Sequence, residues 1–188
     1  MKTEWNSYFD DCPIVAAVKD DEGLAQAAAC DSRVVFILYG TVCNISDLVA
    51  KVKDAGKTAI VHIDLIAGLS AKEVSVDYIR LNTRADGIIS TRPALIRRAQ
   101  ELSLIAIQRF FLIDSIALHN ITKQLEMSRP DFIEILPGVM PKIIHRLRTS
   151  INTPVIAGGL VSDKEDVMAA LGAGAVAVST TNQSIWVM

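Results

Sequence analysis

Two glycine-rich stretches near the C-terminal end of the chain are the strongest indication of its fold. The first reads Pro154-Val-Ile-Ala-Gly-Gly-Leu160, and the second reads Gly172-Ala-Gly-Ala-Val-Ala-Val-Ser-Thr-Thr181. Each is a short apolar strand that ends in small residues, and a helical segment separates the two. In (β/α)₈ barrels, the loops after the last two strands often form a phosphate-binding corner. The two stretches therefore predict a parallel barrel with an anion site at this corner.

The residue types at this corner suit phosphate binding. Glycine lets the backbone approach a ligand closely, as Gly158 and Gly159 would. The hydroxyls of Ser179 and Thr180 would supplement the backbone N–H donors, and a helix N-terminus would favour the anion. We therefore predict that these four residues bind a phosphate group. The alternative for the two glycines is an ordinary tight turn between a strand and a helix.

Short apolar strands alternate with helical segments along the rest of the chain. Strands are predicted at residues 14–18, 34–39, 59–65, 86–90, 104–108, 131–136, 154–157 and 175–178. Strands this uniformly apolar are typical of a parallel sheet that is covered on its outer face. Residues 1–188 are therefore expected to form a single α/β domain, a compact (β/α)₈ TIM-like barrel with a truncated last helix. An open doubly wound sheet is the alternative.

Composition narrows the possible functions. The chain of 188 residues is 51% hydrophobic with a net charge of −2, which excludes a disordered chain and a polycation. Cys12, Cys30 and Cys43 lack metal-binding or disulfide spacing, so neither a metal nor another cofactor is expected. No signal-peptide core and no membrane-length apolar run is present, which predicts a cytoplasmic protein without a membrane partner.

Polar residues at the other strand ends should gather at the barrel mouth, because parallel strands all end on one side. They are Lys19, His62, Asp64, Arg109 and Glu134. Alternation along the strand at 59–65 would turn both His62 and Asp64 inward. Buried charges need partners. We therefore expect the cations Lys19 and Arg109 to face the two carboxylates, Asp64 and Glu134, and an anionic ligand. Each residue also has a purely structural alternative. Lys19 and Arg109 could be solvated surface cations, His62 could be a structural histidine, and Asp64 and Glu134 could form ion pairs that only brace the barrel.

Several segments at the strand ends carry a resemblance to a known family. They are Cys12-Pro-Ile-Val-Ala-Ala-Val-Lys19, Val61-His-Ile-Asp-Leu65, Ala85-Asp-Gly-Ile-Ile-Ser-Thr91, Ile107-Gln-Arg-Phe-Phe-Leu112, Ile133-Glu-Ile-Leu-Pro-Gly-Val-Met-Pro141, Ile156-Ala-Gly-Gly-Leu160, and Ser179-Thr-Thr-Asn182 with Trp186. Together they resemble the glycerol-3-phosphate-responsive antiterminators, which regulate glycerol-uptake operons in bacteria. The resemblance covers nearly the whole chain from Cys12 onward.

The resemblance implies a regulator without catalytic residues. With glycerol 3-phosphate bound, such a protein acts on a leader mRNA so that the downstream terminator is bypassed. The phosphate would then lie on Gly158, Gly159, Ser179 and Thr180, and the glycerol hydroxyls would lie among Lys19, His62, Asp64, Arg109 and Glu134. No cofactor is implied beyond this effector.

The residues themselves say little about RNA. No RNP or KH motif is visible, and aromatic residues make up only 5% of the chain, so a stacking platform is not indicated. The basic candidates for RNA contact are Lys142 and Arg146 on one predicted helix, and Arg97 and Arg98 on an earlier one. An ordinary solvated helix face is the alternative for each pair. A homodimer would double such a patch.

The competing function is an enzyme that acts on a small sugar phosphate. Lysine, histidine and carboxylates at a barrel mouth can serve as acid, base or Schiff-base nucleophile in an isomerase, epimerase or aldolase. A lysine nucleophile has to be largely uncharged, whereas a nearby Asp64 or Glu134 would favour the charged form of Lys19. The residues leave both functions open, and the resemblance favours the regulator.

Overall fold

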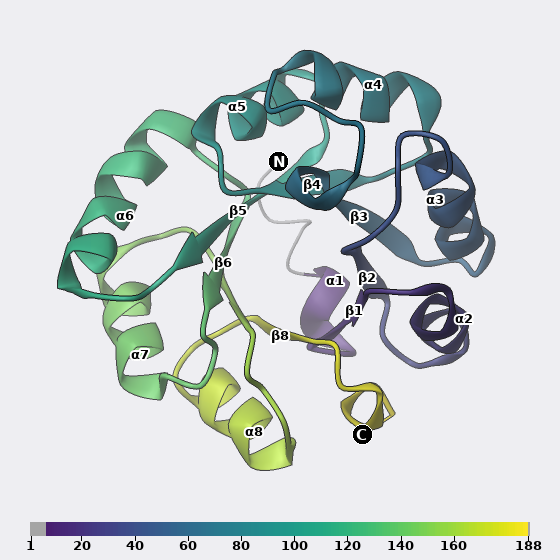
Figure 1. The fold of residues 1–188 in the computed structure, drawn as a ribbon. Coiled ribbons are helices and arrows are strands. Elements are labelled where there is room, and N and C mark those ends of the chain that lie inside the picture. The colour runs from purple at the N-terminus through teal and green to yellow at the C-terminus, as the bar shows by residue number, and fades with distance from the viewer. Residues whose placement is uncertain (1–6, 188) are drawn as a thin grey trace.

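Eight parallel strands close into a barrel in sequence order, with the larger helices arranged around the outside (Figure 1). The structure, a computed structural model, describes residues 7–187. The strands are β1 (Ile14–Val18), β2 (Val34–Ile37), β3 (Thr58–His62), β4 (Gly87–Ser90), β5 (Ile105–Phe111), β6 (Phe132–Leu136), β7 (Val155–Gly158) and β8 (Ala177–Thr180). Since β8 pairs with β1, with Val15 opposite Ser179, the predicted barrel is confirmed and the open sheet is wrong.

A helix follows each of the first seven strands, while a single short 3₁₀ turn follows β8 in the described part of the chain. The helices are α1 (Ser7–Asp10), α2 (Asp21–Ala29), α3 (Ile45–Asp54), α4 (Val74–Asn82), α5 (Pro93–Glu101), α6 (Ser115–Ser128), α7 (Pro141–Ser150) and α8 (Lys164–Gly172), with 3₁₀ turns η1 (Ile63–Leu65) and η2 (Gln183–Ile185). The truncated last helix is thereby confirmed. No helix within residues 7–187 is long and apolar enough to cross a membrane.

Two apolar layers explain why the strands are apolar at almost every position. One layer fills the barrel interior and includes Ala17, Phe36 and Ile107. The other lies between the strands and the helices, where the alternate residues of each strand point. At the amino end of the strands, α1 adds Phe9 to the interior layer, where its ring meets that of Phe132 edge-on at 5.4 Å. The carboxyl ends are thus left as the open mouth.

Five strands (β2, β3, β5, β7 and β8) end at different places from those predicted, and the differences at β3 and β5 bear on the site residues Asp64 and Arg109. β3 stops at His62 and continues as η1, so the predicted extension of this strand to residue 65 is wrong. Asp64 therefore does not follow the inward alternation of Ile60 and His62. β5 continues to Phe111 because it pairs with β6 as far as Leu136, which places Arg109 inside a strand.

The close approach of β4 and β5 provides a test of this packing. A Cβ at Gly87 would lie 2.4 Å from the carbonyl oxygen of Ile105, so Gly87→Ala should cost about 1–3 kcal/mol of unfolding free energy through overpacking. Gly172→Ala is the matched control, since a Cβ there meets nothing within 4 Å. Urea unfolding measures both variants. Equal stability of the two would contradict the barrel register.

Candidate functional site

The mouth of the barrel holds a cavity of about 530 Å³. It is lined by Ala17, Leu38, Arg109, Glu134, Leu136, Gly159, Leu160, Val161, Ser162, Ser179, Thr180, Thr181 and Asn182, which lie at or just beyond the ends of six strands. Five of the predicted site residues meet here: Arg109, Glu134, Gly159, Ser179 and Thr180. Gly158, Lys19, His62 and Asp64 are not part of its lining.

A buried ion pair forms one side of the cavity. The Nε of Arg109 lies 2.5 Å from Oε2 of Glu134, and the side chains are only 10% and 1% exposed. The two residues are direct neighbours in the β5–β6 register, so both side chains point into the barrel at the same height. The other oxygen of Glu134 accepts a 2.5 Å hydrogen bond from the hydroxyl of Ser179. These bonds compensate for removing the Glu134 carboxylate from water.

Gly158 makes room for this hydrogen bond. A Cβ at Gly158 would lie 2.4 Å from Oγ of Ser179 and 2.7 Å from Oε1 of Glu134. Gly158 is therefore required by side-chain packing inside the barrel, whether or not it also lies near a phosphate. Gly159 is required for a different reason, since its φ of +74° lies in the left-handed region.

The two hydroxyls predicted to bind phosphate already have partners within the protein. Ser179 donates to Glu134, and Thr180 donates to the carbonyl of Val161 at 3.0 Å while accepting from the N–H of Asn182 at 3.1 Å. Both residues are buried. In this arrangement neither hydroxyl proton is available to a ligand, so donors for an anion have to come from elsewhere at the mouth.

Backbone N–H groups are free donors at the mouth. Those of Gly159, Leu160 and Val161 after β7, and that of Thr181 after β8, donate no hydrogen bond within residues 7–187. All four residues line the cavity. Leu160 has a φ of +62°, a strained value for a leucine, and its side chain is 76% exposed. Successive free N–H groups of this kind favour an anion.

Sequence reasoning found this loop through its two glycines but missed Leu160, Val161 and Thr181. The side chains of Leu160 and Val161 carry no polar group, so only their backbone N–H groups matter here, whereas Thr181 also offers a hydroxyl at the cavity. Only the positive φ values and the missing acceptors reveal them.

The N-terminus of α8 does not contribute to an anion site in the way predicted. Its N-cap is Asp163, whose carboxylate accepts from the N–H of Asp166 at 2.9 Å. The Asp166 carboxylate in turn accepts from the N–H and the hydroxyl of Ser162, and these bonds lower its pKa. The two carboxylates satisfy this helix end and repel a further anion. A phosphate would therefore lie closer to the end of β7.

His62 lies inside the barrel, where the positive charge of Arg109 acts on its imidazole. The side chain is 3% exposed, and its Nδ1 has no hydrogen-bond partner among the described residues. Burial, followed by the positive charge of Arg109, lowers the pKa of His62 to about 4. The imidazole is therefore neutral at pH 7 and offers a polar group without adding charge.

Asp64 and Lys19 do not form the pairs expected of them. Asp64, carried by η1, accepts from the Ser90 hydroxyl at 2.9 Å and the Thr91 N–H at 2.8 Å, and pairs with Arg92 at 3.5 Å. It ties the end of β3 to the end of β4. Lys19 is exposed just after β1, and within residues 7–187 it has no ion pair or hydrogen bond. Of the expected network of two cations and two carboxylates, the structure forms the Arg109–Glu134 pair, while Lys19 and Asp64 lie outside it.

The predicted RNA contacts lie on the outer wall of the barrel. Lys142 and Arg146 are exposed on α7, and Arg97 is exposed on α5. Arg98 forms ion pairs with Asp77 and Glu101, each with an N–O distance of 2.7 Å. The guanidinium of Arg98 is thus the least available of the four cations.

Comparison with known proteins identifies the family. A sequence model described as glycerol-3-phosphate responsive antiterminator matches residues 14–186. The chain belongs to this family. It is 32% identical to the glycerol uptake operon antiterminator regulatory protein of Listeria monocytogenes, with a TM-score of 0.91, covering 95% of this chain and 96% of that one. A glycerol uptake operon antiterminator-related protein of Thermotoga maritima is also 32% identical, with a TM-score of 0.82, covering 92% and 96%.

The chain is also similar to a protein of Escherichia coli (strain K12). That protein, described as uncharacterized protein YgcP, is 47% identical over 176 residues, which are 94% of this chain and 92% of YgcP. More distant solved structures share the fold alone, among them a deoxyribose phosphate aldolase of Aeropyrum pernix at 16% identity and a TM-score of 0.69. Membership of the family therefore indicates a regulator of glycerol uptake, while the fold by itself is compatible with enzymes.

The buried ion pair leads to a stability prediction. Arg109→Met leaves the Glu134 carboxylate buried without its cation and should cost about 3–5 kcal/mol of unfolding free energy. The double variant Arg109→Met with Glu134→Leu removes the unpaired charge and should recover most of that loss. Urea unfolding at pH 7 measures both. An exposed ion pair contributes below about 1 kcal/mol. If Arg109→Met loses no more unfolding free energy than that, the pair is not buried.

His62 leads to a prediction for pH. The folded protein holds this imidazole neutral down to a pKa of about 4, whereas the unfolded chain binds the proton at about its ordinary 6.5. The unfolded state therefore binds more protons between these values, and stability falls as pH falls. Relative to a His62→Gln variant, the wild type should lose about 3 kcal/mol between pH 6.5 and 4. Parallel pH profiles of the two proteins would contradict the assignment.

Proposed function

We propose that this protein binds glycerol 3-phosphate in the mouth cavity and, with the effector bound, acts on a leader mRNA as an antiterminator of glycerol-uptake genes. The proposal is supported by the family and, above all, by the set of free backbone N–H groups beside Arg109 in that cavity. Acting on a nascent transcript would place the protein in the cytoplasm.

The phosphate is assigned to the loops after β7 and β8. There the residues with free N–H groups, Gly159, Leu160, Val161 and Thr181, line the cavity together with the cation Arg109. The glycerol hydroxyls would then face Glu134, which can accept hydrogen bonds beyond those of Arg109 and Ser179. A volume of about 530 Å³ is ample for a three-carbon phosphate ester.

Binding without catalysis is the second part of the proposal. Glu134 already serves as acceptor for two groups, which suits a structural or ligand-binding carboxylate better than a general base. Within the described residues no lysine lines the cavity, and Lys19 lies exposed beside β1 rather than desolvated as a Schiff-base nucleophile requires. No residue of this site favours the isomerase, epimerase or aldolase alternative.

A phosphorus NMR titration of the purified protein with glycerol 3-phosphate tests the effector site. Gly159→Val should abolish binding, because a Cβ there lies 3.0 Å from Leu136 and valine disfavours the φ of +74° that aims the N–H groups. Gly56→Val is the matched control, with a φ of +73° and nothing within 4 Å, far from the mouth. Both variants carry similar backbone strain, so only Gly159→Val should lose the ligand. Normal binding by Gly159→Val would remove the phosphate assignment.

The same titration, followed for hours, tests for catalysis. A regulator shifts or broadens the glycerol 3-phosphate signal saturably, and no new resonance grows. A product resonance that grows in proportion to the protein concentration would contradict the non-catalytic proposal.

A further inference from the structure

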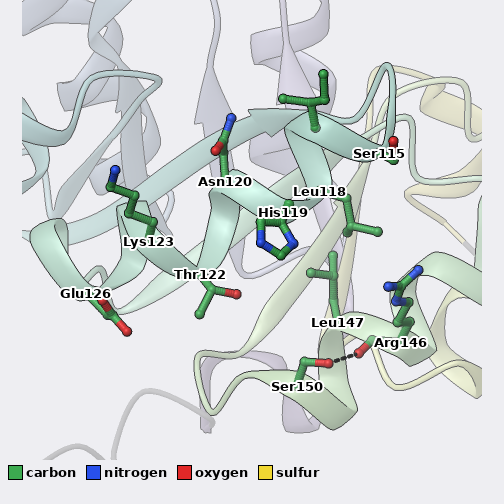
Figure 2. Close-up of a pocket in the computed structure, with 11 residues that line it drawn as sticks. Ser115, Leu118, His119, Asn120, Thr122, Lys123, Glu126, Arg146, Leu147 and Ser150 are labelled. Carbon is green, nitrogen blue, oxygen red and sulfur yellow. Dashed lines mark hydrogen bonds between the residues drawn. The ribbon is translucent and has the colours of Figure 1, made fainter.

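A groove of about 850 Å³ runs between α6 and α7 on the outer wall of the barrel, separate from the mouth cavity (Figure 2). Leu118 and Leu147 lie between the two helices and form its apolar floor. His119, Asn120 and Lys123 line it from α6, and Arg146 lines it from α7. The two helices thus leave between them a groove with an apolar floor and polar residues along its sides.

The charge of this region differs from that of the chain as a whole. Residues 115–150 contain five Lys and Arg against three Asp and Glu, whereas the whole chain has a net charge of −2. Two of the three carboxylates have partners: Glu134 is buried with Arg109, and Asp131 accepts from the N–H of Ala106. Only Glu126 remains as an exposed carboxylate of this segment, at the groove itself.

The cations of the groove are also unpaired in the described structure, whereas several cations elsewhere on the barrel form ion pairs. Arg33, Lys51 and Arg84 each form an ion pair with an aspartate. Lys123 and Arg146 are exposed and, among residues 7–187, have no carboxylate within 4.0 Å. Unpaired cations that share a groove attract a polyanion and release its counterions on binding.

The lining determines which part of a nucleic acid fits. The described lining has cations, an amide and hydroxyls, and its one ring is the imidazole of His119, with no Phe, Tyr or Trp on which a base could stack. It suits a sugar–phosphate backbone, with phosphates near Lys123 and Arg146 and ribose hydroxyls within reach of Asn120. We propose that the α6–α7 groove binds the backbone of a single-stranded segment of the leader RNA, an inference that rests on the proposed function.

The groove is connected to the effector site through the strands β5 and β6, which lead into the two helices that form it. α6 follows β5, the strand of Arg109, and α7 follows β6, the strand of Glu134. An effector that contacts this ion pair acts on the ends of the two strands from which both walls of the groove continue. Its binding can therefore change the spacing of α6 and α7.

The experiment begins with selection of binders from a random-sequence RNA pool by the wild-type protein in the presence of glycerol 3-phosphate. The salt dependence of binding is then measured for the selected RNA. Lys123→Gln and Arg146→Gln should each reduce the log–log salt slope by about 0.7, and the double variant by about 1.4. Lys72→Gln and Arg80→Gln are the matched controls, because both side chains are exposed and unpaired in the described structure but lie outside the groove.

The outcomes separate this inference from the proposed function. If the groove variants bind the selected RNA with the wild-type slope, the groove is not the RNA site, although the protein is still an RNA-binding regulator. If no RNA is enriched while glycerol 3-phosphate binds normally, the antiterminator function fails and the inference fails with it. Sedimentation of the same variants gives the third outcome: a change in subunit number would identify the groove as an interface between copies and overturn the RNA assignment.

Discussion

The mouth of this barrel depends on the buried contact among Arg109, Glu134 and Ser179. It joins side chains from β5, β6 and β8 across the interior, and it is possible only because Gly158 of the intervening strand has no side chain. A carboxylate removed from water has to be neutralised and hydrogen-bonded. The positions of these strand ends, and of the loops that continue from them, follow from that requirement.

Because Glu134 holds these partners, the proposed anion site relies on backbone N–H groups. The hydroxyls of Ser179 and Thr180 serve the protein's own carboxylate and carbonyl groups, and the carboxylates of Asp163 and Asp166 occupy the start of α8. The N–H groups after β7 and β8 are left without acceptors. The proposed anion recognition would depend on the conformation of this loop, which includes the positive φ of Gly159.

The separation between mouth and outer wall suits a regulator. A ligand enclosed at the mouth can act on the strand ends, while a partner too large for the cavity has the helical surface available. The same barrel supports enzymes in distant structures, where the fold alone is shared. In this chain no lysine among the described residues lines the mouth cavity, and the outer groove carries the unpaired cations Lys123 and Arg146.

The amino-acid sequence alone determined the barrel, because the alternation of apolar strands and helices is local and repeats along the chain. It also placed Arg109 and Glu134 at one mouth, since neighbouring parallel strands end together. Tertiary structure decided the rest. β3 ends at His62 and η1 begins at Ile63, and this places Asp64 beside Ser90. The packing of side chains decides which hydroxyls and N–H groups have no partner. The α6–α7 groove likewise depends on the distance between two helices, which a one-dimensional pattern of residues does not encode.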